Sequence, residues 1–147
     1  MSHFLVAVIL PKGSKDVENT VTELLAPFDE QLEVPEYKRP CLCIEDIPDP
    51  ICKTCNGSGI ELTTCNPQSK WDSWVIGGRW DAGKNIKLCS EMVEPFAIVT
   101  PEGEWIEKGE MGWWAIVSNE KSNWDVIYKE VFKKYAGYQA AMVDCHI

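Results

Sequence analysis

Four cysteines in two close pairs are the residues best suited to chemistry. The segment from Cys41 to Cys55 reads C-L-C, eight further residues, then C-K-T-C, and continues as N-G-S-G. A Cys-x2-Cys pair puts two thiolates on one tight turn, at about the separation that a tetrahedral Zn²⁺ requires. The asparagine and glycines that follow can adopt the positive φ that folds the chain back over an ion. The spacing predicts one structural Zn²⁺ bound by Cys41, Cys43, Cys52 and Cys55, with free thiols in a loop as the alternative.

The segment from Trp71 to Trp80 contains three tryptophans, two adjacent glycines and an arginine. The guanidinium of Arg79 offers a planar fork to a phosphate or carboxylate, and tryptophan faces stack on bases or cations. The two glycines allow another backbone or a ligand to approach closely. We therefore expect a ligand-binding surface formed by Asp72, Trp74, Arg79 and Trp80. Two alternatives stay open: the tryptophans pack in the core, and Arg79 pairs internally with Asp72 or Asp81.

The stretch Asp144-Cys145-His146 invites a catalytic interpretation. Adjacent residues on a strand point to opposite faces, so Cys145 and His146 cannot pair with each other there. Asp144 and His146 share a face, and they are the catalytic candidates, as a base and the group that orients it. The alternative is a strand with a polar fringe. His3 has no partner that the sequence identifies.

Hydrophobic periodicity places the regular elements. Apolar runs predict strands over 4–10, 71–80, 95–100, 104–106, 112–118 and 140–147. Helical spacing of apolar residues predicts one helix that ends before Pro27 and a second over 124–135. Residues 28–40 are expected to form a covering loop or a short edge strand.

This order of elements resembles a ferredoxin-like, split βαβ arrangement. We therefore expect an α+β fold in one domain over 1–147, with an antiparallel sheet and two helices. The cysteines would lie in a small zinc-ribbon-like insert over 41–68.

Longer motifs resemble a group of phage proteins found mainly among phages of actinobacteria. The matching pieces are N-P-Q-S-K-W-D-S-W-V-I-G-G-R-W from Asn66 to Trp80, G-E-W-I-E-K-G-E-M-G-W-W from Gly103 to Trp114, and V-D-C-H-I from Val143 to Ile147. Asp29 and Glu30 match as well. The half-site C-K-T-C-N-G-S-G also resembles the zinc-binding repeats of DnaJ-type chaperones. The resemblance implies a viral or prophage origin and a location in the host cytoplasm. It implies no particular activity.

Charge and composition narrow the classes of partner. The formal net charge is −9, so the chain gains little from the counterion release that drives nucleic-acid binding, and a basic partner suits it better. No run approaches ~18 apolar residues, and no secretory leader is evident, so we expect no membrane span and a cytoplasmic location in the host cell. In a reducing cytoplasm, clustered cysteines indicate metal more often than disulfides.

These observations favour a phage accessory protein that acts by binding. Its partner would be a host protein or a small anionic ligand such as a nucleotide, and a homodimer stays open. One alternative is an enzyme that acts on a nucleotide or phosphoester through Arg79, Asp144 and His146. A structural or assembly component is the other.

Overall fold

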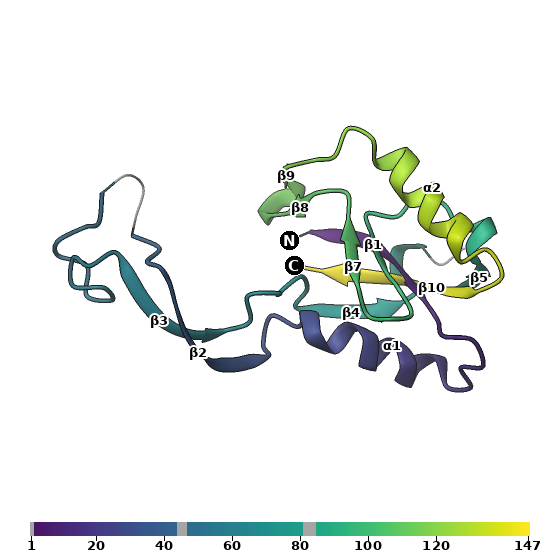
Figure 1. Cartoon of the computed structure of the whole chain (residues 1–147), viewed down its shortest axis with the longest axis horizontal. Coiled ribbons are helices and arrows are strands. Elements are labelled where there is room, and N and C mark those ends of the chain that lie inside the picture. The colour runs from purple at the N-terminus through teal and green to yellow at the C-terminus, as the bar shows by residue number, and fades with distance from the viewer. Residues whose placement is uncertain (1, 44–46, 81–84) are drawn as a thin grey trace.

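The computed structural model describes residues 2–43, 47–80 and 85–147, and it shows a body from which a long arm projects (Figure 1). The body is a mixed sheet with α1 (Val17–Leu25) and α2 (Trp124–Lys134). The arm is a hairpin of β2 (Glu33–Pro40) and β3 (Ile60–Cys65). The fold is therefore α+β.

Six described strands form the main sheet, in the spatial order β4, β10, β1, β6 and β7, with β5 also paired to β10. Their bounds are β1 His3–Ile9, β4 Ser73–Ile76, β5 Ile86–Leu88, β6 Ala97–Val99, β7 Trp105–Glu107 and β10 Gln139–His146. β4 pairs with the C-terminal half of β10 and β5 with its N-terminal half. Both strands therefore pair with the same edge of β10.

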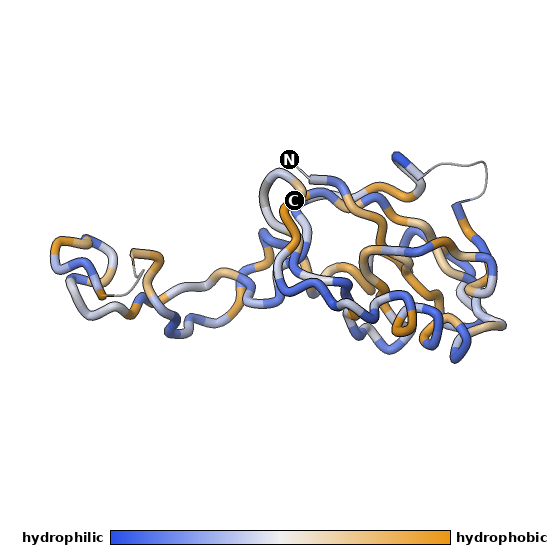
Figure 2. Tube along the Cα trace, turned by 90° about the horizontal axis from the view of Figure 1, so that it is seen from above, coloured by the Kyte–Doolittle hydropathy of each residue, from blue (hydrophilic) through white to orange (hydrophobic). Residues whose placement is uncertain are grey.

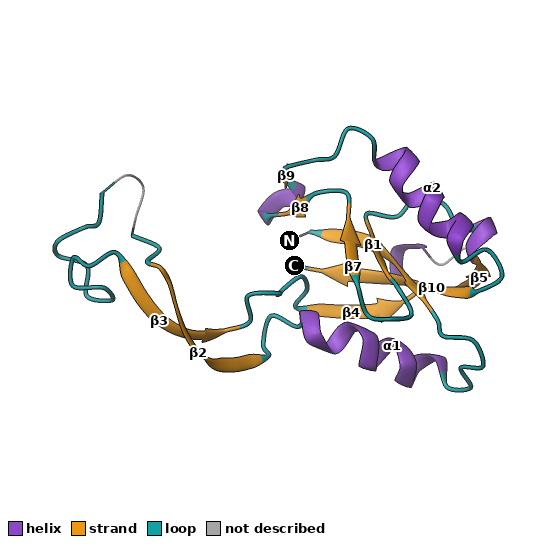
Figure 3. Ribbon diagram, viewed as in Figure 1, coloured by secondary structure: helices purple, strands orange, loops and turns teal. Residues whose placement is uncertain are grey.

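The central strand β1 is apolar on both faces, and this determines where the helices pack. Val6 and Val8 belong to one core cluster, together with Leu25 of α1. Ala7 and Ile9 belong to a second cluster, which contains the buried side chains of α2. Because successive side chains of a strand alternate between faces, the two helices cover opposite faces of the sheet (Figure 3).

A specific hydrogen bond anchors the first turn of each helix. The side chain of Asp16 caps α1 by accepting a hydrogen bond from the backbone N–H of Asn19 at 3.1 Å. In α2, the fully buried Trp124 donates its indole N–H to the carbonyl of Pro95 at 2.8 Å. Neither of these two helices is long and apolar enough to cross a membrane.

Two features differ from the expected split βαβ arrangement. In a split unit another strand separates the two parallel strands, whereas β1 and β6 pair directly and in parallel. The helices also lie on opposite faces of the sheet rather than together on one. The reason is the burial of β1 on both sides, since a strand without a polar face needs apolar cover from two layers.

The strand expected over 112–118 is wrong. A 3₁₀ turn, Trp113–Ala115, separates the short β8 (Glu110–Met111) from β9 (Val117–Ser118). The backbone of Trp114 adopts φ of 60°, which no strand contains. Ser2 stabilises the turn, because its hydroxyl donates to the carbonyl of Gly112 and accepts from the N–H of Ala115.

Candidate metal centre and a histidine–carboxylate cluster

The far end of the arm brings four cysteines into one cluster. The Sγ atoms of Cys41, Cys43, Cys52 and Cys55 all lie within 4.8 Å of one another. The Sγ atoms of Cys41 and Cys52 are 3.8 Å apart, and those of Cys43 and Cys55 are 3.6 Å apart. Tetrahedral coordination with metal–sulfur bonds of about 2.3 Å separates neighbouring sulfurs by about 3.8 Å. The four cysteines are therefore positioned to hold a metal ion.

The backbone around the cysteines folds back as the N-G-S-G sequence predicts. Asn56 has φ of 52°, and Gly57 and Gly59 have φ of 83° and 75°. The hydroxyl of Ser58 donates to the carbonyl of Cys55 at 2.7 Å, which tightens the turn. These positive φ values favour glycine and asparagine and disfavour branched side chains.

Backbone donors prepare one thiol of the cluster for metal binding. The backbone N–H groups of Cys55 and Thr54 point at the sulfur of Cys52 and lower its pKa to about 6. A thiolate is the form that binds metal, so this cysteine is ready to bind at neutral pH. Four thiolates close a tetrahedral site and leave no position for water or substrate. Such a centre organises the chain around it and has no place for a reactant.

The base of the arm is fastened to the end of α1 by the motif that begins at Asn66. The buried Asn66 amide donates to the carbonyls of Pro27 and Asp29, at 2.8 and 2.9 Å. Trp71, which is also buried, donates its indole N–H to the carbonyl of Leu25 at 3.0 Å. Because both ends of the arm meet here, these hydrogen bonds fix where the arm leaves the body.

A second cluster lies where β1, β10 and β4 meet. His3 and His146 are directly opposite each other on β1 and β10, with ring centroids 4.9 Å apart. His3 donates from Nδ1 to Asp144 at 2.8 Å, and His146 donates from Nδ1 to Asp72 at 2.6 Å. Each imidazole is thus oriented by its own carboxylate, and each Nε2 is left for another partner.

The expected pairing of Asp144 with His146 is wrong. The two residues share a face of β10, as expected, but the Asp144 carboxylate turns toward His3. Asp144 lies opposite Leu5 in the register of the two strands, so His3 is its diagonal neighbour across the strand pair. Cys145 points to the opposite face, where burial and the charge of Asp144 raise the pKa of its thiol.

Asp144 also explains the second of the two glycines before Arg79. Its side chain is only 3% exposed, and its second oxygen accepts the backbone N–H of Arg79 at 3.0 Å. A Cβ on Gly78 would lie 2.5 Å from both Cβ and Oδ2 of Asp144. Gly78, with φ of 52°, is therefore required for close approach of the carboxylate. Gly77 is likewise packed against the side chain of Asn85.

The environment of Asp72 favours its charged form. Burial would raise the pKa of this carboxyl, but hydrogen bonds from His146 and Ser73 outweigh it and hold the pKa below its usual value. Asp72 therefore does not pair with Arg79, and Asp81, the other expected partner, lies outside the described residues. The Asp72 carboxylate instead accepts a hydrogen bond from Nδ1 of His146.

The remaining expected ligand-binding residues separate into two environments. Trp74 packs against the body core, on the same face as Ile76. Trp80 lines an open groove of about 250 Å³ together with His3, Phe96 and other residues. The side chain of Arg79 is exposed. Trp80 and Arg79 thus lie near the histidines, whereas Trp74 belongs to the core.

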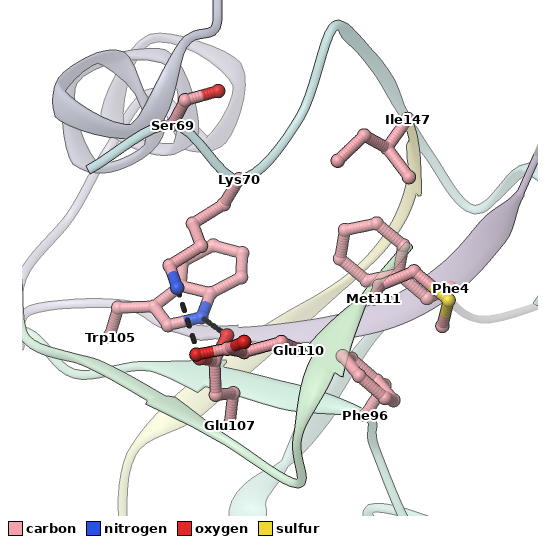
Figure 4. Close-up of a pocket in the computed structure, with 9 residues that line it drawn as sticks. All are labelled: Phe4, Ser69, Lys70, Phe96, Trp105, Glu107, Glu110, Met111 and Ile147. Carbon is pink, nitrogen blue, oxygen red and sulfur yellow. Dashed lines mark hydrogen bonds and ion pairs between the residues drawn. The ribbon is translucent and has the colours of Figure 1, made fainter. Parts of the chain in front are cut away.

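A neighbouring cavity of about 190 Å³ has polar groups that already satisfy one another. Lys70 and the indole N–H of Trp105 donate to the two carboxylate oxygens of Glu107, at 3.0 and 2.8 Å (Figure 4). Apolar side chains, including Phe4 and Ile147, line much of the rest of the cavity. An anionic ligand would have to displace Glu107 from Lys70 before it could bind in this cavity.

The comparisons with known proteins do not assign the chain to a family. No protein-family model, no curated protein and no solved structure matches it. The cysteine cluster and the histidine–carboxylate cluster therefore carry the functional inference.

Proposed function

We propose that this protein is a phage accessory protein whose metal-stabilised arm binds a host protein. The observation that carries the proposal is the exposure of large aliphatic side chains at the end of the arm. Leu42, Ile47 and Ile51 are 82%, 79% and 84% exposed. Hydrophobic colour accordingly appears at the far end of the arm as well as inside the body (Figure 2). Clustered exposed aliphatic side chains mark an interaction surface.

The arm has no evident role in folding the body. Neither core cluster of the described residues contains a side chain from β2 or β3. Ile60 and Leu62 on β3 are also more than half exposed. A two-stranded hairpin without apolar cover is only marginally stable in water. An arm of this kind therefore gains order from its metal centre, and it gains apolar burial only from a partner.

Zinc is the proposed metal. Four thiolates in a tetrahedral arrangement suit Zn²⁺ and exclude Mg²⁺ and Ca²⁺, which take oxygen ligands. Iron shares this ligand set, so metal analysis has to distinguish the two. The role of zinc here is to hold the segments that carry Leu42 and Ile51 together, so that less conformational entropy is lost when a partner binds.

A host protein with a basic rim is the proposed partner. The chain carries a net charge of −9, which favours association with a basic surface and disfavours nucleic acid. The resemblance to actinobacterial phage proteins implies a partner in the host cytoplasm. Burying one aliphatic side chain contributes about 1.5–3 kcal/mol, or about 10- to 150-fold in affinity. Two or three such side chains are enough for specific binding.

Site-directed photo-crosslinking in host cells tests the proposal. A photoreactive residue at Ile51 should yield one discrete adduct with a host protein, and the same residue at Val126 should not. Val126 is the matched control, because it is a half-exposed aliphatic residue on α2, away from the arm. Purified partner should then bind at least tenfold more weakly to Leu42→Asp and to zinc-depleted protein, while Val126→Asp binds normally.

Three results would overturn this function. An adduct of twice the chain mass would assign the arm to a homodimer. Equal cross-linking from positions 51 and 126 would show non-specific contact. Unchanged affinity of the Leu42→Asp variant would remove the apolar tip from the binding surface.

A further inference from the structure

The chain contains only two histidines, and they come from positions 143 residues apart to form a cross-strand pair. Their rings meet edge to face, with an interplanar angle of 70°. His3 is fixed by the buried carboxylate of Asp144, and His146 by the partly exposed carboxylate of Asp72. Core packing does not account for this cluster, because both imidazoles are partly exposed.

Carboxylate contacts at Nδ1 determine what each imidazole can do. A carboxylate accepts hydrogen bonds only, so Nδ1 of each histidine is the donor and Nε2 of the neutral ring is free to accept a proton. Imidazole exchanges its proton near neutral pH, so one ring can hold a proton while its neighbour accepts one. General acid–base catalysis of a displacement at phosphorus needs one group that takes a proton from the attacking oxygen and another that gives a proton to the leaving oxygen.

The groove beside His3 indicates the class of substrate. Trp80 and Phe96 supply aromatic surface to it, and Lys108 lies on its polar side. Lys108 is 3.6 Å from Glu94 and 3.4 Å from Glu120, so its charge is shared with two carboxylates. The backbone N–H of Arg79 donates to Asp144, and the side chain of Arg79 is exposed. An aromatic wall next to a lysine suits a nucleoside phosphate, and the net charge of −9 favours a small one over a polymer.

We propose that His3 and His146 form a general acid–base pair that hydrolyses a small nucleoside phosphodiester. Nε2 of the neutral imidazole takes a proton from water as the water oxygen bonds to phosphorus. The bond from phosphorus to the leaving oxygen breaks, and Nε2 of the protonated imidazole gives its proton to that oxygen. One water is consumed, and the products are an alcohol and a phosphomonoester. Asp144 and Asp72 are positioning residues.

The charged groups around the pair come from several elements. Asp144 on β10 and Asp72 before β4 contact the imidazoles directly. Glu94 and Lys108 line the groove with His3, and Arg79 lies in the connection between β4 and β5. The pH profile of hydrolysis is therefore expected to report the histidine pair as a coupled unit, with a bell shape.

Two substrates with different leaving groups separate the two roles. The zinc-loaded full chain is assayed with thymidine 5′-(p-nitrophenyl phosphate) and with a nucleoside 2′,3′-cyclic phosphate. A nitrophenolate leaves without help from an acid, whereas the ribose oxygen of the cyclic phosphate needs a proton. Loss of the base should lower kcat/KM about 100-fold or more for both substrates. Loss of the acid should do so only for the cyclic phosphate.

His3→Gln and His146→Gln are the test variants, and one of them should show each pattern. Asp72→Asn should lower the rate less and shift one limb of the pH profile, which a purely structural role would not do. Asp125→Asn, at an exposed aspartate in the first turn of α2, is the control and should match the unmodified chain. Thermal unfolding shows whether each variant is folded.

The outcomes are decisive because the chain has no other histidine. The proposal is overturned if neither substrate reacts faster with the unmodified chain than with the doubly substituted His3→Gln, His146→Gln variant. Equal rates for the two single variants and the unmodified chain would overturn it as well. The histidine ring protons give a second readout, since inorganic phosphate should shift both NMR signals, and phosphate without effect on either contradicts the site.

Discussion

Replacement of Gly78 by alanine tests the contact between the β4–β5 connection and the Asp144 carboxylate. The new Cβ would lie 2.5 Å from both Cβ and Oδ2 of Asp144, much closer than atoms can approach without movement. Alanine at φ of 52° also costs about 1–2 kcal/mol of backbone strain. Overpacking at the contact adds about 1–3 kcal/mol. We expect Gly78→Ala to lower the free energy of unfolding by roughly 2–5 kcal/mol.

Gly13→Ala is the matched control. Gly13 has φ of 81°, and a Cβ added there meets nothing within 4 Å. The control therefore carries the backbone strain without the clash, and the difference of about 1–3 kcal/mol isolates the contact with Asp144. Urea unfolding followed by tryptophan fluorescence measures both variants. Gly78→Ala should also move the ring-proton NMR signals of His3, because Asp144 is displaced from it, and Gly13→Ala should leave them in place.

Equal destabilisation by the two substitutions would refute this reasoning. It would show that the backbone conformation alone selects glycine at position 78, and that the carboxylate of Asp144 has room to move.

Three further predictions follow from single contacts. Cys52→Ser should abolish stoichiometric metal binding. It should also remove hydrogen-exchange protection from the arm, whereas β1 and β10 should keep their protection. Loss of protection throughout the chain would contradict a separately organised arm. Val131→Asp should destabilise the body by about 2 kcal/mol or more in urea unfolding, because Val131 packs against the core cluster that contains Ala7 and Ile9. The control, Val126→Asp on the exposed face of α2, should change the free energy of unfolding by less than about 0.5 kcal/mol. The pKa of Asp72 is lower in the folded state than in the unfolded chain. The ionised carboxylate therefore stabilises the fold at pH above its unfolded pKa of about 3.9, and this contribution is lost as the pH falls through the folded pKa. Asp72→Asn should therefore cost more stability at pH 6 than at pH 3, and a cost independent of pH would contradict the pairing with His146.

The sequence predicts elements whose signal is local. The apolar run of β1 and the helical spacing of α2 appear at the expected positions. The paired cysteines are also a local signal, because each pair lies on a single turn and the following N-G-S-G supplies the positive φ values. Burial of β1 on both faces, evident from its unbroken apolar run, could have indicated that the helices cover opposite faces.

Features that depend on distant contacts could not be predicted in the same way. The hydrogen bond from His3 to Asp144 joins residues 141 positions apart, and nothing in the pattern of either strand pairs them. β2 shows no hydrophobic alternation, and in β3 the alternating Ile60 and Leu62 are exposed, because neither face of the arm is buried. The turn at Trp114 depends on Ser2, which is distant in the sequence. The apolar run alone made 112–118 resemble a strand.

The most direct test of the account is the coordination of the metal on the arm. X-ray absorption spectroscopy of protein purified from host cytosol should show zinc, one ion per chain, with four sulfur ligands at about 2.3 Å. Only the closed cluster of Cys41, Cys43, Cys52 and Cys55 supplies four thiolates in the described chain. Absence of metal, or a shell that contains nitrogen or oxygen ligands, would contradict a closed thiolate centre as the organiser of the arm.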